Sequence, residues 1–174
     1  MIWFWSFFLY SFAGFVLEVL FSWLAGTRSH RKGLLVLPIC PVYGLGACLI
    51  LLLPPWVQAR PWALFLLGGV TATAAEYFDA VYHQRVLGVS FWDYSGLPGN
   101  LHGRVCLPFS LAWGVLSLVL VYGVNPALLP WLARIPAPVS AVSLAALVFD
   151  AALTLLILRQ TGDTARLQWY RRPQ

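Results

Sequence analysis

The sequence predicts an all-α, polytopic membrane protein with five transmembrane helices. Hydrophobic residues make up 60% of the 174 residues and charged residues only 10%, and the mean hydropathy is +0.78. A soluble domain averages about 45–50% apolar and about 25% charged residues. The composition therefore excludes a soluble enzyme, a disordered chain and a nucleic-acid-binding module, so we expect membrane lipids and no nucleic acid among the partners.

Five stretches approach the about 20 apolar residues that a spanning helix needs. They form a single membrane domain, 1–174, that ends in a tail at 159–174. The first stretch has no positively charged leader and no small-residue cleavage site, so we expect it to stay in the mature protein. The five predicted spans are Ile2–Leu24, 34–53, Pro61–Tyr82, 105–122 and 139–158.

The basic residues alternate between the connections. Nine of the eleven Lys and Arg residues fall in the first and third connections and the tail, and only Arg60 and Arg134 fall in the others. By the positive-inside rule the basic segments are cytoplasmic. This predicts an inner-membrane protein with its N-terminus outside and its C-terminus inside. The nine are Arg28, Arg31, Lys32, Arg85, Arg104, Arg159, Arg166, Arg171 and Arg172.

The second and fourth spans begin alike, which predicts an internal repeat. Gly33, Leu37-Pro38 and Tyr43-Gly44 recur 70 positions later as Gly103, Leu107-Pro108 and Trp113-Gly114. We therefore expect two parallel two-helix units, 2–53 and 61–122, with an added fifth span, an arrangement that some transporters use. In the second span, Pro38 and Pro41 should bend or break the helix.

Four acids lie inside the predicted spans, and intramembrane carboxylates are usually functional. Glu18, Glu76 and Asp150 each precede a cytoplasmic arginine by nine or ten residues, which places each about 14 Å above it. They could share one layer, in which at least one carries a proton or all surround a cation. Packing between helices through hydrogen bonds is the alternative.

Glu76, Asp79 and His83 follow one another on one stripe of the third span. Together with His102 they make a weak candidate for a metal site, because their spacing matches no strong motif. We expect no metal and no cofactor.

The long connection 83–104 is rich in turn formers and aromatic residues but low in net charge. Phe91, Trp92 and Tyr94 suit a loop that folds back onto the helices. We expect Asp93 or Asn100 to cap helix ends, and Asp93 to pair with Arg104.

The motifs Glu76-Tyr77, Trp92-Asp93-Tyr94-Ser95 and the segment 100–107 resemble the CmpB-like membrane proteins, which are catalogued as type IV ABC-transporter permeases. Gly14, Glu18 and the stretch Pro41-Val42-Tyr43-Gly44 also resemble that family, and the likeness covers roughly residues 11–126. The segment His30-Arg31-Lys32 and Gln84 depart from its pattern.

The resemblance implies a permease. The chain has no nucleotide-binding GxxxxGK[ST] motif, so an ATPase would be a separate subunit, and five spans are few for a permease, which suggests a homo-oligomer. We assign no catalytic residue. The expected substrate- or ion-binding residues are Glu18, Tyr43, Glu76, Asp79, Trp92, Asp93, Tyr94, Asn100, Arg104 and Asp150.

The favoured function is a transporter or permease subunit in which an acidic intramembrane site is closed by the loop at 92–104. Such a site favours cationic or amine-bearing solutes. A membrane-embedded enzyme acting on a lipid or isoprenoid is one alternative, with Glu76, Asp79 and His83 as acid, base or metal-binding groups. A non-catalytic assembly subunit is the other.

Overall fold

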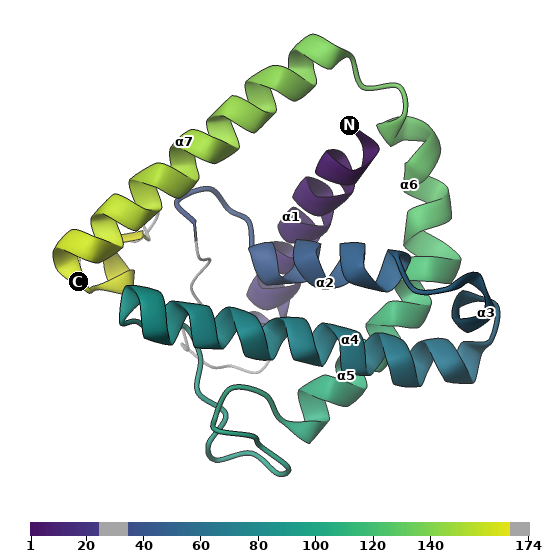
Figure 1. The fold of residues 1–174 in the computed structure, drawn as a ribbon, viewed down its shortest axis with the longest axis horizontal. Coiled ribbons are helices and arrows are strands. Elements are labelled where there is room, and N and C mark those ends of the chain that lie inside the picture. Colours follow the sequence, from purple (N-terminus) through teal and green to yellow (C-terminus); the bar gives the residue numbers. More distant parts are fainter. Residues whose placement is uncertain (25–34, 168–174) are drawn as a thin grey trace.

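The structure is a computed structural model that describes residues 1–24 and 35–167 (Figure 1). The described part is helical and contains no β-strand, only one isolated bridge between Leu101 and Val105. Gly33 of the predicted repeat and several basic residues of the topology argument lie outside the described residues. These basic residues are Arg28, Arg31, Lys32, Arg171 and Arg172.

Seven α-helices and three short π- or 3-10 segments follow one another along the described chain. They are α1 (Ile2–Leu24), α2 (Pro41–Leu51), α3 (Pro55–Gln58), α4 (Pro61–Tyr82), η1 (His83–Leu87), α5 (Leu107–Val119), η2 (Leu120–Val124), α6 (Asn125–Leu132), α7 (Ala137–Thr161) and η3 (Thr164–Leu167).

Four helical stretches of the described chain are long and apolar enough to cross a membrane: Ile2–Leu24, Pro61–Leu87, Leu107–Leu132 and Ala137–Thr161. Large apolar side chains are exposed along all of them, as expected where lipid takes the place of water. The chain is therefore a multi-pass membrane protein. Two of the predicted spans begin where α1 and α4 begin, and the fourth is longer than expected because α5, η2 and α6 are continuous.

The second predicted span, 34–53, is not a continuous helix. Residues 35–40 are not helical, and α2 begins only at Pro41 and holds 11 residues. Such a helix rises about 16 Å, which is short of the about 30 Å hydrocarbon core. The expected irregularity at the two prolines is confirmed, because the chain is not helical through Pro38 and becomes helical only at Pro41. Pro41 occupies the first turn of α2, where a missing N–H costs nothing.

Helices α1 and α2 pack closely, as do α4 and α5, and α2 also packs against α4. A Cβ on Gly44 of α2 would overlap the Phe7 carbonyl oxygen and the Ser11 hydroxyl of α1. A Cβ on Gly114 of α5 would lie 2.8 Å from the Phe65 carbonyl oxygen of α4. Both interfaces therefore depend on glycine, which lets helix backbones approach.

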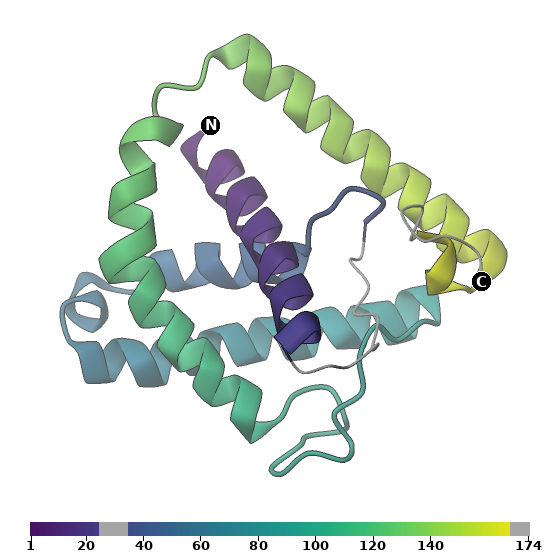
Figure 2. The ribbon, with the colours of Figure 1, turned by 180° about the vertical axis from the view of Figure 1, so that it is seen from behind.

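The buried core lies among α1, α2, α4, α5 and η2. In Figures 1 and 2, α1 crosses α2, while α7 runs along the outside of the assembly. Figure 1 shows the N-terminus and the α6–α7 connection toward the top, α3 at the right, the 88–106 loop at the bottom and the end of α7 at the left. The core residues are Tyr10, Ala47, Ile50, Leu64, Ala72, Trp113 and Leu120.

Candidate functional site

A cavity of about 450 Å³ lies between α1, the start of α2, α4 with η1, α5 and the 88–106 loop. Three carboxylates line it, those of Glu18, Glu76 and Asp79, together with the imidazole of His83. Aromatic rings form much of the remaining wall. The aromatic lining residues are Phe21, Tyr43, Phe91, Trp92, Tyr94, Phe109 and Trp113.

Glu76 is buried, with 6% of its surface exposed. The Tyr94 hydroxyl donates a hydrogen bond to Glu76 Oε1 at 3.0 Å, and Trp113 Nε1 donates to Oε2 at 2.9 Å. These donors come from the loop and from α5, so the carboxylate joins three elements. Both donors are neutral, so they orient the carboxylate without cancelling its charge.

Glu18 has a similar arrangement in the other half of the molecule. The Tyr43 hydroxyl, at the start of α2, donates to Glu18 Oε1 at 2.6 Å. The Tyr43 and Trp113 rings then meet, with their centroids 4.9 Å apart. The two aromatic donors therefore stand side by side, each oriented toward its own glutamate.

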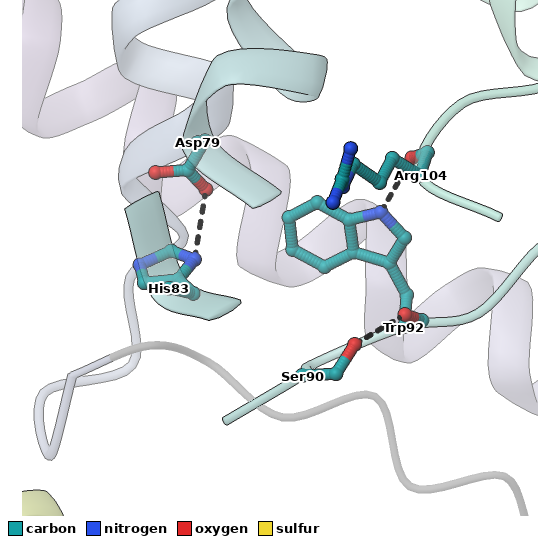
Figure 3. A network of polar contacts seen from close by, with 5 residues as sticks. All are labelled: Asp79, His83, Ser90, Trp92 and Arg104. Atoms are coloured by element: carbon teal, nitrogen blue, oxygen red, sulfur yellow. Dashed lines mark hydrogen bonds and ion pairs between the residues drawn. The ribbon is translucent and has the colours of Figure 1, made fainter. Parts of the chain in front are cut away.

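Asp79 and His83 face each other one helical turn apart, with Asp79 Oδ2 3.5 Å from His83 Nδ1 (Figure 3). Trp92 lies beside this pair, its ring centroid 6.4 Å from that of His83. The stripe Glu76, Asp79 and His83 thus lies on the cavity wall. No group of three His, Cys, Asp or Glu side chains within the described ranges is arranged to hold a metal ion.

The loop between η1 and α5 folds back onto the helices, as the sequence predicts. Phe91, Trp92 and Tyr94 line the cavity. Trp92 Nε1 donates to the Arg104 carbonyl oxygen at 2.7 Å, which fixes the indole in place (Figure 3). The Tyr94 amide donates to the Gly103 carbonyl oxygen at 2.7 Å, so the two arms of the loop are joined at the aromatic residues.

The polar residues of the loop act inside it and do not cap helix ends. Asn100 Nδ2 donates to the carbonyl oxygens of Ser95 and Leu97, each at 3.1 Å. Asp93 accepts hydrogen bonds from the Ser95 amide and hydroxyl. Their predicted capping role is therefore replaced by turn formation, which suits Asp and Asn side chains.

The side chain of Arg104 packs against α4 and η1. The predicted pairing of Arg104 with Asp93 is therefore not formed. Its Nε donates to Gln84 Oε1 at 2.8 Å, and its Nη1 donates to the Tyr77 hydroxyl at 2.9 Å. The Tyr77 hydroxyl also lies 3.0 Å from His102 Nδ1. Arg104 and His102 are thus engaged with Tyr77 of the third span and are not among the cavity-lining residues, although Arg104 lies beside Trp92, which lines the cavity (Figure 3).

Hydrogen bonds from Ser95 lower the pKa of Asp93 below its ordinary value, and the bond from the Ser95 hydroxyl contributes more than the bond from its amide. Stabilisation of the loop by the Asp93 carboxylate is therefore present above the ordinary pKa and is lost as pH falls through the lowered one. We expect Ser95→Ala to raise the pKa of Asp93. An NMR titration of the Asp93 carboxyl carbon in both proteins measures this, and an unchanged midpoint would contradict it.

Asp150 lies elsewhere from the other acids and is not among the cavity-lining residues. Both of its carboxylate oxygens lie 3.2 Å from the Leu37 amide nitrogen. Leu37 belongs to the non-helical stretch before α2, whose backbone donors have no helical partner. Unpaired backbone groups at membrane depth are costly. The carboxylate of Asp150, on α7, therefore stabilises the non-helical part of the second span.

We expect Asp150→Leu to destabilise the protein by roughly 1–3 kcal/mol, because the partly buried Leu37 amide loses its acceptor. Asp150→Asn keeps one acceptor oxygen and should cost much less. Thermal unfolding of both variants in the same detergent measures the difference. Equal losses for the two variants would show that the charge of Asp150, and not its hydrogen bond, stabilises the fold.

Several wall residues were not singled out from the sequence. Trp113 is the most important of them, because it donates to Glu76. Its signal was present in the predicted repeat, which relates it to Tyr43. Phe91 was expected in the folded-back loop but not as a binding residue. Phe109 and Cys40 carried no such signal, because an aromatic or small apolar side chain in a membrane protein is usually lipid-facing or core.

The fold and this site define a polytopic helical membrane protein with an acidic, aromatic cavity between its helices. A family model described as "Putative ABC-transporter type IV", of the CmpB type, matches residues 5–157. The chain belongs to this family, as its sequence motifs indicate. Searches of the curated proteins and of the solved structures gave no match.

Proposed function

We propose that the protein is the membrane subunit of a transporter and that it binds an organic cation in the cavity between α1, α2, α4 and α5. One observation carries this proposal: three carboxylates, Glu18, Glu76 and Asp79, line a single cavity whose remaining wall is largely aromatic. The family to which the chain belongs supports a transport role.

The chemistry of the wall favours a cation over an anion. Carboxylates attract a positive charge, and aromatic faces add a cation–π attraction that strengthens when water is removed. The cavity of about 450 Å³ falls within the about 300–1,000 Å³ typical of pockets for small organic molecules. A cation with apolar groups would therefore be bound through both its charge and its surface.

The 88–106 loop is proposed to close the cavity on the cytoplasmic side. The excess of basic residues in the first and third connections and the tail supports this orientation. The Tyr94 hydroxyl links the loop to Glu76 by a hydrogen bond. A ligand that binds the Glu76 carboxylate would therefore also affect the position of the loop. The proposed orientation places the N-terminus outside and the C-terminus inside.

The proposed second crossing combines the non-helical residues 35–40 with α2, because the 11 residues of α2 rise only about 16 Å. Residues 35–38 bend, and the Ile39 amide donates to the Leu37 carbonyl oxygen, so this part of the crossing is irregular. The Asp150 carboxylate supports this placement, because it supplies an acceptor to the Leu37 amide of the non-helical part.

Matched contacts in the two halves support the proposed internal repeat. Tyr43 donates to Glu18, and Trp113, 70 positions after Tyr43, donates to Glu76, 58 positions after Glu18. The glycines that follow, Gly44 and Gly114, also lie 70 positions apart, and they approach Phe7 and Phe65, which lie 58 apart. Each half would then supply one glutamate and one aromatic donor to a shared site.

Family membership also supports a separate ATPase subunit, and we propose one. We also propose an inner-membrane location, on the alternation of basic residues between the connections. A homo-oligomer is proposed on the small number of spans. Cross-linking in the membrane, followed by mass determination, would report both kinds of partner.

Binding and flux of a lipophilic cation test the proposed function. We expect the purified protein to bind tetraphenylphosphonium and its liposomes to take the cation up faster than empty liposomes. Absence of both binding and uptake would overturn the proposal and favour an assembly subunit. Turnover of a lipid in the same liposomes, without uptake, would overturn it in favour of a membrane-embedded enzyme.

A further inference from the structure

His83 is a buried imidazole that lines the cavity. Its exposed fraction is 1%, and neither ring nitrogen has a hydrogen-bond partner among the described residues. Asp79 Oδ2 lies near Nδ1, at 3.5 Å, but outside hydrogen-bond geometry. A buried polar group without a partner costs free energy, so such a group in a native site calls for an explanation.

One carboxylate and three aromatic rings are close neighbours of His83. Asp79 faces it along the same helix, and the rings of Phe91, Tyr82 and Trp92 lie at centroid distances of 5.0, 5.5 and 6.4 Å, each in edge-type contact with the imidazole. Phe91 and Tyr82 are within the about 6 Å over which an aromatic ring attracts a cation. Within the described lining of the cavity, His83 is the one side chain that can carry a positive charge.

The other titratable groups on this cavity come from four elements. Glu76 shares α4 with Asp79, Glu18 comes from α1, and Tyr94 comes from the loop. Cys40 and Tyr43 come from the start of α2, whereas α5 contributes Phe109 and Trp113, which do not titrate. The charged groups in the lining, besides His83, are therefore carboxylates, and the Arg104 guanidinium, which donates to Gln84 next to His83, is not part of the lining. Helix α7 meets η1 through the apolar cluster that holds Leu158 and Leu87.

We propose that the Asp79–His83 pair holds an exchangeable proton in the empty cavity and releases it when an organic cation binds. This inference rests on the proposed function. The proton leaves a His83 nitrogen, or an Asp79 oxygen, and passes to water, while the arriving cation takes its place beside the carboxylates. One positive charge enters and one leaves, so no other reactant is needed.

The physical reason is that two cations cannot share this cavity at low cost. Repulsion between like charges is far stronger in a poorly solvated interior than in water. When the proton is on His83, the imidazolium is the counter-charge of the carboxylates. When the organic cation is bound, the neutral imidazole has the lower free energy. Cation and proton should therefore compete, and the site would exchange one for the other.

Calorimetric titration of the purified protein with tetraphenylphosphonium, in two buffers of different ionisation enthalpy, measures the protons released. We expect release of up to about one proton per bound cation, with affinity rising by up to about tenfold per pH unit where the pair is protonated. His83→Gln should still bind the cation but release fewer protons. His102→Gln, which changes a histidine outside the cavity, should behave as the wild type does.

The outcomes separate the two proposals. Binding to the wild type with no proton release at any pH would overturn the exchange mechanism and leave the proposed function standing. Release by His83→Gln equal to that of the wild type would overturn the assignment to His83. Failure of the wild type to bind the cation would overturn both. The wild-type measurement decides the matter even where the variant does not fold.

Discussion

Glu76→Gln is expected to lower the affinity for tetraphenylphosphonium by about tenfold or more, equal to ~1.4 kcal/mol of lost interaction, with little loss of stability. The amide oxygen of the glutamine can accept from Trp113 Nε1, and its NH₂ can donate to the Tyr94 hydroxyl, which also accepts. The hydrogen-bonded frame is thus kept while the negative charge is removed. Calorimetric affinity and thermal unfolding of the same preparation measure the two effects.

Glu76→Leu is the matched variant for a packing role. It leaves the Tyr94 hydroxyl and the Trp113 indole N–H without their acceptor, which costs roughly 1–3 kcal/mol for each buried donor. We therefore expect Leu to lower stability clearly where Gln does not. If Glu76→Gln binds the cation as the wild type does and is equally stable, Glu76 is a packing residue and the cavity is not a charge-dependent site.

Gly44→Ala is expected to give the largest loss of stability among small substitutions, roughly 1–3 kcal/mol as for other overpacked sites. The added methyl would overlap the Phe7 carbonyl oxygen, and this backbone atom cannot move aside as a flexible side chain can. Helices α1 and α2 would have to separate, which would also move Tyr43 away from Glu18. We therefore expect weaker cation binding in the same variant.

Gly123→Ala is the matched control, because a Cβ at Gly123 meets no atom within 4 Å. It should leave unfolding and binding close to those of the wild type. Thermal unfolding of the two variants side by side provides the measurement. Equal stability of Gly44→Ala and Gly123→Ala would mean that α1 and α2 do not approach as closely as the structure has them.

The parts of the fold that depend on long apolar stretches could be predicted from the sequence. The bounds of α1 and α4 match their predicted spans, because each stretch has the length of a bilayer-spanning helix and α4 begins at Pro61, a residue suited to a first helical turn. The return of the loop onto the helices was predictable for a related reason. Three bulky aromatic residues, Phe91, Trp92 and Tyr94, are costly to leave in water.

The short helix α2 could not be placed from hydropathy, because residues 35–40 are as apolar as a helix would be. Their irregular path is supported by partners far away in the sequence: Asp150 accepts from the Leu37 amide, and the Ser11 carbonyl oxygen accepts from the Cys40 amide. The sequence also predicted that Asp150 shares one layer with Glu18 and Glu76, because the three acids are expected at the same depth in the membrane. Depth says nothing of which way a side chain points around its helix, and the carboxylate of Asp150 is engaged with Leu37.

Within the site, sequence spacing was informative along one helix and weak between helices. The stripe of Glu76, Asp79 and His83 was visible, because residues three, four and seven apart share a helix face. The contact of Tyr43 with Trp113 depends on how two pairs of helices cross. No single stretch of sequence records that crossing, although the proposed repeat relates the two positions.

The central claim is that Glu18, Glu76 and Asp79 line one cavity that binds an organic cation. Diffraction from crystals grown with tetraphenylarsonium, whose arsenic atom scatters anomalously, tests it most directly. The account predicts an anomalous peak inside the cavity, among these carboxylates and the rings of Tyr43, Trp92 and Trp113. A peak found only on the lipid-facing surface, with the cavity empty at saturating cation, would contradict it.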